Sequence, residues 1–439
     1  MIVCMEPKHF ESLYPGDSRF NEIEKILGFI RNGNSCQLIS FPGTGRSNVL
    51  NLLSYNRSVR EKHLGENQKH LHFAYMDFSE VKNRSLFDVY KFILLSLMDS
   101  LLDRGLKEEH DKVHEIFAEH VKYNDDLVFF QGIKEAVNYL ALEKKLTIVF
   151  LFDKFEKYLP NLTDEFFASL RILRNKAKYR FSAVFSLDRP LEDSLDPLQF
   201  AQFYEFLAGN DVYVSIYDVP GISFRRSYFE KKFNKKLSEQ DFKNIVELTA
   251  GHGRLTRVAL ETVFAEQTFP KKNDLEKLLF EQKNLLNALF EIWKYLTPQE
   301  KKTLGKEKID FLEKIGLTKN NFVTIPLFEK YVEEQAEIPS EKIDLDESSG
   351  EIKKGQEILS GKLTSSEYKL LKYLLQNSGK IIERDEIIKN VWKDSASIAG
   401  VTDQALDQLV LRLRKKIEED PNYPAHLLTI KGRGFKFTS

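Results

Sequence analysis

The sequence predicts a multidomain α/β protein that begins with a doubly wound parallel sheet and ends in a small domain of helices and a β-hairpin. Helical segments separate five strand-like apolar runs, an order that favours a parallel sheet covered on both faces: 36–41, 72–78, 146–153, 181–188 and 212–216. From about residue 341 this alternation stops. The chain there predicts helices followed by two short strands, TIKGRGFKF, around a glycine-flanked turn.

Length and composition limit the classes of protein that this chain can belong to. With 439 residues, the chain is long enough for about two to four domains. A net charge of −1 gives no overall attraction to nucleic acid, so any surface that binds nucleic acid must be a local cluster of positive charge. Cys4 and Cys36 are too few for a disulfide framework or a zinc site, and we expect a cytoplasmic location. No apolar stretch approaches the roughly 18 residues that a membrane span needs, so we expect no membrane partner.

The segment VTDQALDQLVLRLRKKIEE has the pattern of a helix that is buried on one side. At about 3.6 residues per turn, apolar side chains gather on one face, namely Leu406, Leu409, Val410, Leu413 and Ile417. The opposite face carries amides and cations, namely Gln404, Gln408, Arg412 and Lys415. Gln and Arg can hydrogen-bond adenine and guanine edges in a major groove, and the hairpin turn can place a cation against a phosphate or in a minor groove. The pattern predicts contact with duplex DNA.

Four motifs follow one another from about Glu341 to the C-terminus: LTSSE–YKLLKYLL, ERDEII–VW, LRLRKKI and TIKGRGFKF. In this order they resemble the effector domain of the OmpR/PhoB response regulators, with that family's preceding small sheet at 343–345, 351–353 and 357–359. The resemblance implies a winged helix-turn-helix that binds double-stranded DNA and regulates transcription, with RNA polymerase as a further partner. Because one such domain reads a short half-site, we also expect a homo-oligomer on DNA.

The residues expected at the DNA lie on the recognition helix and the wing: Thr402, Gln404, Gln408, Arg412, Arg414, Lys415, Lys416, Thr429, Lys431 and Arg433. The family commonly has Arg at the position of Gln404, so its base preference is not carried over to this chain. The alternative interpretation is a structural winged helix that contacts proteins through solvated charges.

A second informative segment, PGTGRS, lies between a strand-like run and a helix-like one. A glycine-rich loop at a helix N-terminus forms a nest of backbone N–H groups aimed at a phosphate. Gly43, Gly45 and Ser47 fit the phosphate-loop motif G-x-x-x-x-G-K-[ST], but Ser40 stands in place of the first Gly and Arg46 in place of the Lys. Anion binding and Mg²⁺ ligation by the serine are still expected, although Arg is not a simple substitute for Lys.

The apolar run LTIVFLFD ends in Asp153, as expected for a buried strand that delivers a Walker B aspartate. The residues from this aspartate onward resemble the D-E-x-D pattern of AAA+ and STAND-type ATPases. Lys154 occupies the position of the catalytic Glu, where we expect its charge to face a γ-phosphate, and Asp153 and Glu156 are the catalytic candidates. After the next strand-like run, Ser186 or Asp188 occupies the sensor-1 position.

The segment LTAGHGR resembles the lid motif of the same ATPases, with Arg254 as a sensor-2 arginine; the alternative is a solvated arginine after a glycine turn. These resemblances imply a P-loop module that binds ATP or ADP with Mg²⁺. The implied nucleotide-binding residues are Gly43, Thr44, Gly45, Arg46, Ser47, Asp153, Ser186 and Arg254, with Ser47 and Asp153 also serving the metal. Because Arg46 and Lys154 compromise phosphoryl transfer, we expect at most slow ATP hydrolysis.

The expected domains are a P-loop ATPase-like α/β domain at 1–217, a helical lid at 218–282, a small winged helix at 283–335, a linker at 336–340 and the OmpR/PhoB-like domain at 341–439. We predict a sequence-specific transcriptional regulator whose DNA-binding domain is controlled by a nucleotide-binding module. The first half lacks a receiver-like pattern of acids, so phosphorelay control is not expected. Two alternatives stay open: a STAND-type signalling or defence switch with a protein-binding winged helix, and a replication-initiator-like ATPase.

Overall fold

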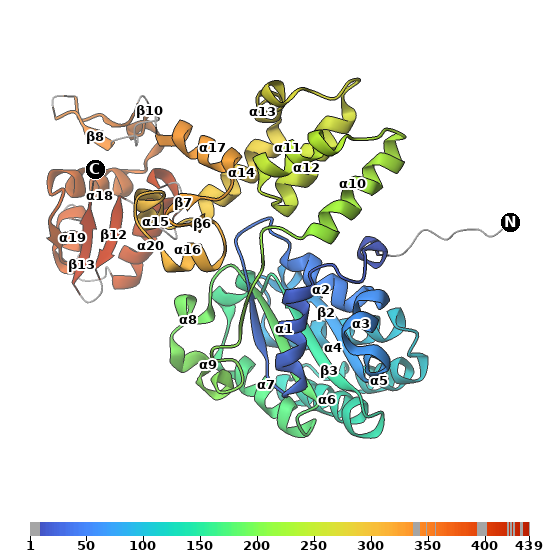
Figure 1. The fold of residues 1–439 in the computed structure, drawn as a ribbon. Helices are drawn as coiled ribbons and strands as arrows, with labels where there is room; N and C mark the ends of the chain where they lie inside the picture. Colours follow the sequence, from blue (N-terminus) through green and yellow to red (C-terminus); the bar gives the residue numbers. More distant parts are fainter. Residues whose placement is uncertain are drawn as a thin grey trace. The chain divides into compact units, whose positions relative to one another are not determined.

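The computed structural model of the chain describes residues 9–336, 343–347, 349–355, 357–392, 402–418, 421, 424, 426–430 and 433–438 (Figure 1). The chain divides into two compact units. One comprises Met1–Tyr295 and Leu304–Glu329, and the other comprises Leu296–Thr303 and Lys330–Ser439. Residues 337–340 of the expected linker lie outside the described residues.

The first unit is built on a five-stranded sheet in the order β2-β3-β4-β1-β5. Every neighbouring pair of strands is parallel, so the predicted parallel α/β sheet is confirmed. The strands lie where the apolar runs predicted them: β1 at Cys36–Ile39, β2 at Leu71–Asp77, β3 at Thr147–Asp153, β4 at Phe181–Leu187 and β5 at Asp211–Tyr213.

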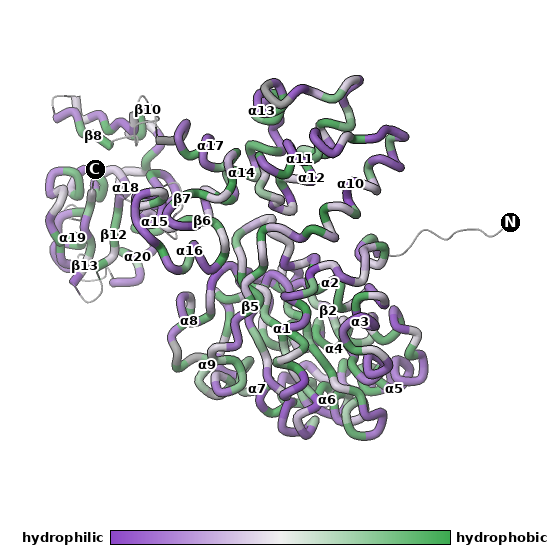
Figure 2. The backbone as a smooth tube through the Cα atoms, in the orientation of Figure 1, coloured by the Kyte–Doolittle hydropathy of each residue, from purple (hydrophilic) through white to green (hydrophobic). Residues whose placement is uncertain are grey.

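Both faces of this sheet are buried, because successive side chains of each strand point into different hydrophobic cores. In β3, Phe150 and Phe152 enter one core, whereas Val149 and Leu151 enter the other. Figure 2 shows hydrophobic residues concentrated along these strands. Helices α4 (Leu86–Asp103), α5 (Lys107–His120), α6 (Asp126–Asn138), α7 (Asp164–Lys176) and α9 (Pro197–Tyr204) supply the first core, and α1 (Phe20–Arg31), α2 (Arg46–Tyr55) and α3 (Arg57–Leu64) the second.

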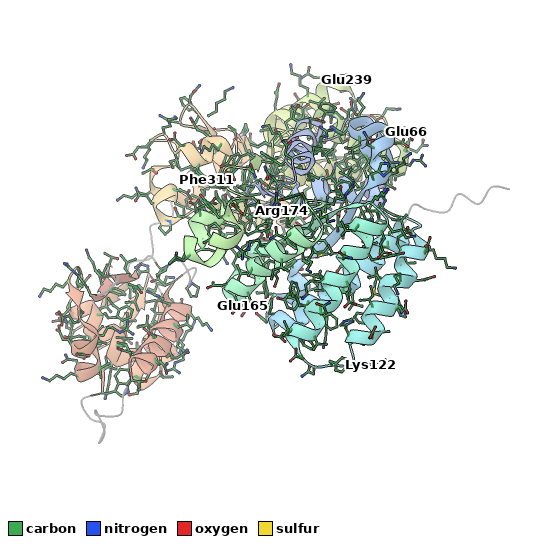
Figure 3. The ribbon with its side chains drawn as sticks, turned by 90° about the horizontal axis from the view of Figure 1, so that it is seen from below. Glu66, Lys122, Glu165, Arg174, Glu239 and Phe311 are labelled. Atoms are coloured by element: carbon green, nitrogen blue, oxygen red, sulfur yellow. The ribbon has the colours of Figure 1, made fainter. Side chains whose placement is uncertain are left out.

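Charged side chains lie mostly on the outside of this unit, as Lys122 and Glu165 do in Figure 3. Arg174 of α7 is an exception, since its side chain is buried. Its Nε donates to the carbonyl of Gly33 at 2.9 Å, and its guanidinium lies 3.7 Å from the ring centroid of Phe206. This cation is therefore satisfied within the fold.

Helix α8 (Leu191–Ser194) lies between β4 and β5. A group of helices follows β5, namely α10 (Val219–Phe233), α11 (Glu239–Thr249), α12 (Gly253–Ala265), α13 (Lys272–Phe280) and α14 (Lys283–Tyr295). Helix α12 packs against α10, α11 and α14 (Figure 1). The side chain of His252 accepts a hydrogen bond from the N–H of Leu255 and so begins α12 immediately beside the turn Gly251–Gly253. The lid motif therefore lies at the start of a well-packed helix.

The region expected to be a small winged helix contains α15 (Pro298–Thr303), α16 (Asp310–Lys314), the antiparallel strands β6 (Thr318–Lys319) and β7 (Phe322–Val323), and α17 (Pro326–Ala336). The division into two units assigns α15 to the second unit and α16 to the first. The boundaries 283–335 therefore stay a prediction.

The C-terminal part of the second unit begins with a small antiparallel sheet of β8 (Ile343–Leu345), β9 (Ile352–Lys354) and β10 (Glu357–Ile358). It continues with α18 (Ser365–Gln376), β11 (Ile381–Ile382), α19 (Arg384–Val391) and α20 (Asp403–Ile417), and it ends with β12 (Leu427–Ile430) and β13 (Gly434–Phe437). The last three strands form a sheet in the order β11-β13-β12.

One hydrophobic core joins these elements, and it contains the apolar face predicted for the recognition helix: Leu406, Leu409, Val410, Leu413 and Ile417. The prediction of a helix buried on one side is confirmed. Within the described residues, no helix of either unit has the length and apolar character that crossing a bilayer requires.

Candidate functional site

Helix α20 presents a polar face to solvent. Its N-cap is Thr402, whose side chain accepts a hydrogen bond from the N–H of Ala405 at 3.3 Å. Four side chains predicted for base and phosphate contact are exposed: Gln404, Gln408, Arg412 and Lys415. The two cations among them form no ion pair within the described residues. These side chains are therefore available to an external partner.

Two other predicted DNA contacts on α20 are engaged within the domain. Arg414 donates to the carbonyl of Leu427 at 2.6 Å and to Oγ1 of Thr429 at 2.8 Å, and burial lowers its pKa. Lys416 Nζ lies 2.5 Å from Oε2 of the buried Glu367. Burial alone would raise the pKa of Glu367, but hydrogen bonds, with that from Lys416 first, lower it. Both cations brace α20 against neighbouring elements.

The wing approaches the body of the domain at Gly434. This residue has φ 131°, and a Cβ at this position would lie 2.1 Å from the carbonyl oxygen of Ile382. Only glycine fits there without a shift of the backbone. Arg433 and Thr429 are exposed on the wing, and Lys431 lies outside the described residues.

Arg384 of α19 is a site residue that sequence reasoning missed. Its Nε lies 2.8 Å from Oδ1 of Asp403, and its Nη2 lies 2.6 Å from Oδ1 of Asp407. Hydrogen bonds to these carboxylates raise the pKa of Arg384. The pairing offsets two negative charges on the helix that carries the predicted DNA contacts. No motif marks it, because the partners lie 19 and 23 residues away in the sequence.

In the first unit, the phosphate loop joins β1 to α2. Gly43 and Gly45 adopt φ values of 83° and 117°, which favour glycine. Among the described residues, no protein acceptor takes a hydrogen bond from the N–H groups of Gly43, Thr44 and Gly45. The first N–H groups of α2 also lack helical partners, as at any helix N-terminus. The loop is therefore a nest of donors with unused hydrogen-bonding capacity.

A cavity of about 420 Å³ opens at this nest. The loop contributes one side of it, and the turn before α12 contributes another. The cavity is rich in cations, with a single carboxylate in its lining; the lining residues used below are Tyr14, Arg19, Ser47, Asp218, Arg225, Arg254 and Arg257. Hydrogen-bond donors and positive charge at one helix N-terminus suit a polyanion.

The lid motif contacts the phosphate loop directly. The N–H of Arg254 donates to the carbonyl of Gly43 at 3.0 Å, and Nε2 of His252 lies 3.0 Å from the carbonyl oxygen of Pro42. Burial lowers the pKa of His252 to about 4, so the neutral ring donates through Nε2. A Cβ on Gly43 would lie 2.6 Å from Cε1 of His252. The guanidinium of Arg254 pairs with Glu291 of α14.

Arg46, the substitute for the motif lysine, turns away from this cavity into a group of acids at the ends of β3 and β4. Its Nη2 lies 2.5 Å from Oδ1 of Asp188 and 3.7 Å from Oε1 of Glu156. Burial would lower the pKa of Arg46, but the charges of Asp188 and Glu156 outweigh it and raise the pKa. Burial also raises the pKa of Glu156 to about 7. The guanidinium of Arg46 is therefore paired with these carboxyl groups inside the protein.

Lys154 contacts an acid of the neighbouring strand. Its amine lies 2.6 Å from Oδ2 of Asp77 at the end of β2, and this hydrogen bond raises the pKa of Lys154. The acid on the neighbouring strand holds the amine here, and the expected approach of this charge to a γ-phosphate stays a prediction. Asp153 is buried and accepts a hydrogen bond from the hydroxyl of Tyr75 at 2.7 Å.

The predicted nucleotide-binding residues therefore separate into two groups. The cavity lining includes Gly43, Thr44, Gly45, Ser47 and Arg254 but does not include Arg46, Asp153 or Ser186. The Ser186 hydroxyl is buried and has no hydrogen-bond partner among the described residues. Asp188, the other residue at the sensor-1 position, is the one that contacts Arg46.

These residues fit a polyphosphate better than they fit a metal ion held by the protein alone. The unpaired loop amides can donate to phosphate oxygens, and the arginines of the lining add positive charge. Among these arginines, Arg19 already donates to the carbonyls of Ser215 and Thr44. Ser47 lines the cavity, while both oxygens of Asp153 already accept hydrogen bonds, from Tyr75 and from the N–H of Lys154. The part of the chain that the structure describes has no cluster of three or more His, Cys, Asp or Glu arranged to hold a metal. A bound Mg²⁺ would therefore depend on nucleotide oxygens.

Comparison with known proteins is decisive for the C-terminal domain. Residues 357–437 match the family model "Transcriptional regulatory protein, C terminal". The C-terminal domain is an OmpR/PhoB-type DNA-binding domain. Over 74 residues the chain is 47% identical to the sensory transduction protein RegX3 of Mycolicibacterium smegmatis, a match that covers 17% of this chain and 31% of that protein. Over 86 residues it is 40% identical to the transcriptional regulatory protein KdpE of Mycobacterium tuberculosis, covering 20% and 35%. The chain thus spans about a third of the length of these curated relatives.

The remainder of the chain is similar to a different class of protein. The Walker-type ATPase PABY2304 of Pyrococcus abyssi superposes with a TM-score of 0.50 and 14% identity, covering 75% of this chain and 99% of that one. At this identity the likeness concerns the fold alone. The chain therefore combines a transcriptional-regulator DNA-binding domain with an N-terminal module whose fold is similar to that of a Walker-type ATPase.

Proposed function

We propose that this protein is a sequence-specific transcriptional regulator whose DNA binding responds to nucleotide bound in the ATPase-like module. The observation that carries the nucleotide part is the nest of unpaired N–H groups at Gly43–Gly45, which opens into a cavity with four arginines. Because the lid turn hydrogen-bonds to the same loop, an occupant of this cavity touches both parts. Occupancy can therefore shift the lid between two arrangements.

The proposed ligand is ATP or ADP, with Mg²⁺ bound through the nucleotide, and hydrolysis is slow or absent. Arg46 is engaged with Asp188 and Glu156, and Lys154 with Asp77. The groups that would stabilise the transferring phosphoryl group are thus committed elsewhere, which suits a switch that responds to occupancy.

The proposed DNA contacts are Gln404, Gln408, Arg412 and Lys415 in the major groove and Thr429, Lys431 and Arg433 at the wing, with Thr402 at the helix start. Arg414 and Lys416 act mainly by bracing the domain, because their charged groups are engaged inside it. The exposed cations on α20 favour DNA over the alternative of a protein-binding adaptor. We further propose that the protein binds DNA as a dimer and contacts RNA polymerase there.

The test combines calorimetry with DNA binding. Titration of the full chain with ATP and with ADP is expected to show binding of both nucleotides. The double variant Ser47→Ala, Gly45→Val is expected to bind neither. Gly361→Ala serves as a control, since a Cβ at this glycine meets nothing within 4 Å. No binding of either nucleotide by the wild-type chain would refute the nucleotide part. A chain that fails to retard any genomic DNA would refute the regulatory part.

A further inference from the structure

A second cavity adjoins the one at the phosphate loop. It has a volume of about 400 Å³ and shares two lining residues with the first cavity, Arg225 of α10 and Arg257 of α12. These helices pack side by side (Figure 1). The rest of its lining is aromatic and charged: Phe10, Tyr228, Phe229, Lys232 and Glu261. The two arginines therefore form a wall common to both spaces.

The cations of this second cavity outnumber its acids. Arg257 lies 3.6 Å from Glu261, the single carboxylate in the lining. Arg225 and Lys232 form no ion pair among the described residues. The guanidinium of Arg225 lies 5.7 Å from the ring centroid of Tyr14, and the amine of Lys232 lies 5.6 Å from that of Phe233. A cluster with two uncompensated cations attracts a further anion, because charge-assisted hydrogen bonds are among the strongest available.

The same cavity offers rings against which a sugar or base can pack. The rings of Phe10 and Tyr228 meet edge to face with centroids 5.0 Å apart, and Tyr228 is 37% exposed. Phe10 also contacts Tyr14, which lines the first cavity, at 5.7 Å. Ring contacts thus connect Tyr14, in the lining of the first cavity, with Phe10 and Tyr228, in the lining of the second.

Because the two cavities share Arg225 and Arg257, a nucleotide whose 5′-polyphosphate occupies the loop can extend along α10 and α12 into the second cavity. From this arrangement we infer that the site takes a nucleotide with a second phosphate ester, on the ribose 2′- or 3′-hydroxyl. Arg225, Lys232 and Arg257 bind that second phosphate, and the aromatic rings pack against the adjoining sugar or base. This inference rests on the nucleotide binding proposed above.

Calorimetry of the full chain tests the inference. The adenine probes are ADP, 2′-phospho-ADP and 3′-phospho-ADP, and the guanine probes are GDP and guanosine 5′-diphosphate 3′-diphosphate. One of the ribose-phosphorylated forms is expected to bind at least about tenfold tighter than its parent diphosphate, because a charged hydrogen bond contributes about that much. Lys232→Ala is expected to remove the gain and leave ADP binding unchanged, because Lys232 lines the second cavity and not the first. Lys231→Ala, an exposed neighbour outside the cavity lining, is the matched control.

The outcomes separate the two proposals. If ADP binds and no ribose-phosphorylated form gains affinity, the second phosphate site is refuted while the proposed nucleotide function stands. If a gain is seen but Lys232→Ala and Lys231→Ala reduce it equally, the assignment to these residues is wrong. If none of the five nucleotides binds, both proposals fail.

Discussion

Two adjacent lysines of α20 allow DNA contact to be separated from domain stability. Lys415 is exposed and forms no ion pair within the described residues. Lys416 Nζ lies 2.5 Å from Oε2 of Glu367, whose side chain is only 2% exposed. The same carboxylate accepts the N–H of Thr364 at the start of α18. Removing either lysine deletes one positive charge, but only one removal leaves a buried carboxylate short of a partner.

For Lys416→Ala we expect the free energy of unfolding to fall by about 1–3 kcal/mol, the usual effect of leaving a buried polar group unsatisfied. In a domain of about this size each kcal/mol lowers the melting temperature by about 4–8 °C. For Lys415→Ala we expect no change in stability. Instead, affinity falls for all DNA sequences alike, and the slope of log affinity against log salt becomes shallower by about 0.9 if one phosphate contact is lost.

The pH dependence gives the prediction for Lys416 a second readout. Glu367 has a lowered pKa in the folded state, so its stabilising effect is present above its unfolded-state value and is lost as pH falls through the folded-state pKa. The stability difference between wild type and Lys416→Ala is therefore largest at neutral pH and shrinks in acid.

The assay uses residues 341–439, whose hydrophobic core is formed within this segment. Thermal unfolding gives stability, and anisotropy of a labelled duplex between about 50 and 200 mM salt gives the slope. The reasoning is refuted if Lys415→Ala lowers the melting temperature as much as Lys416→Ala does. It is also refuted if Lys415→Ala leaves the salt slope at its wild-type value.

Three further predictions concern the ATPase-like module. Glu156→Gln is expected to gain stability relative to wild type as pH rises from 4.5 to about 7, because burial raises the pKa of Glu156 and its ionisation opposes folding in that window; parallel unfolding curves at all pH values would contradict this. Gly43→Ala is expected to weaken nucleotide binding by displacing His252, which a Cβ would approach to 2.6 Å, and calorimetry checks it against Gly361→Ala. Wild-type hydrolysis of ATP is expected to stay well below one turnover per second, about the lower end of ordinary enzymes, in a sensitive phosphate-release assay. Turnover of several per second would mean that the contacts of Arg46 and Lys154 rearrange when nucleotide binds.

Local patterns were enough to predict much of the fold. The run before Asp153 predicted a buried strand because its residues are apolar at every position from 148 to 152, and both faces of β3 are indeed covered. The recognition helix was predictable from spacing alone, since its five buried residues repeat at helical intervals. In both cases the pattern that determines burial lies within one short segment of the sequence.

The partners of charged side chains were not predictable in the same way. Arg46 pairs with Asp188, which lies 142 residues further along the chain, and only the packing of β4 beside β1 brings them together. Lys154 meets Asp77 for the same reason, because β2 and β3 are neighbours. Arg225 and Arg257 had no motif to mark them. The one available signal was the spacing of three residues from Arg254, which places Arg257 near the same face of α12.

The most direct test of the account is the affinity of the full chain for its DNA with and without ATP, measured in the wild type and in Ser47→Ala combined with Gly45→Val. A genome-wide binding map supplies the DNA sequence. The account predicts that saturating ATP changes the affinity of the wild type by about fivefold or more, within the usual range of coupling between two sites, and leaves the affinity of the variant unchanged. Equal wild-type affinity in the presence and absence of a nucleotide that demonstrably binds would contradict it.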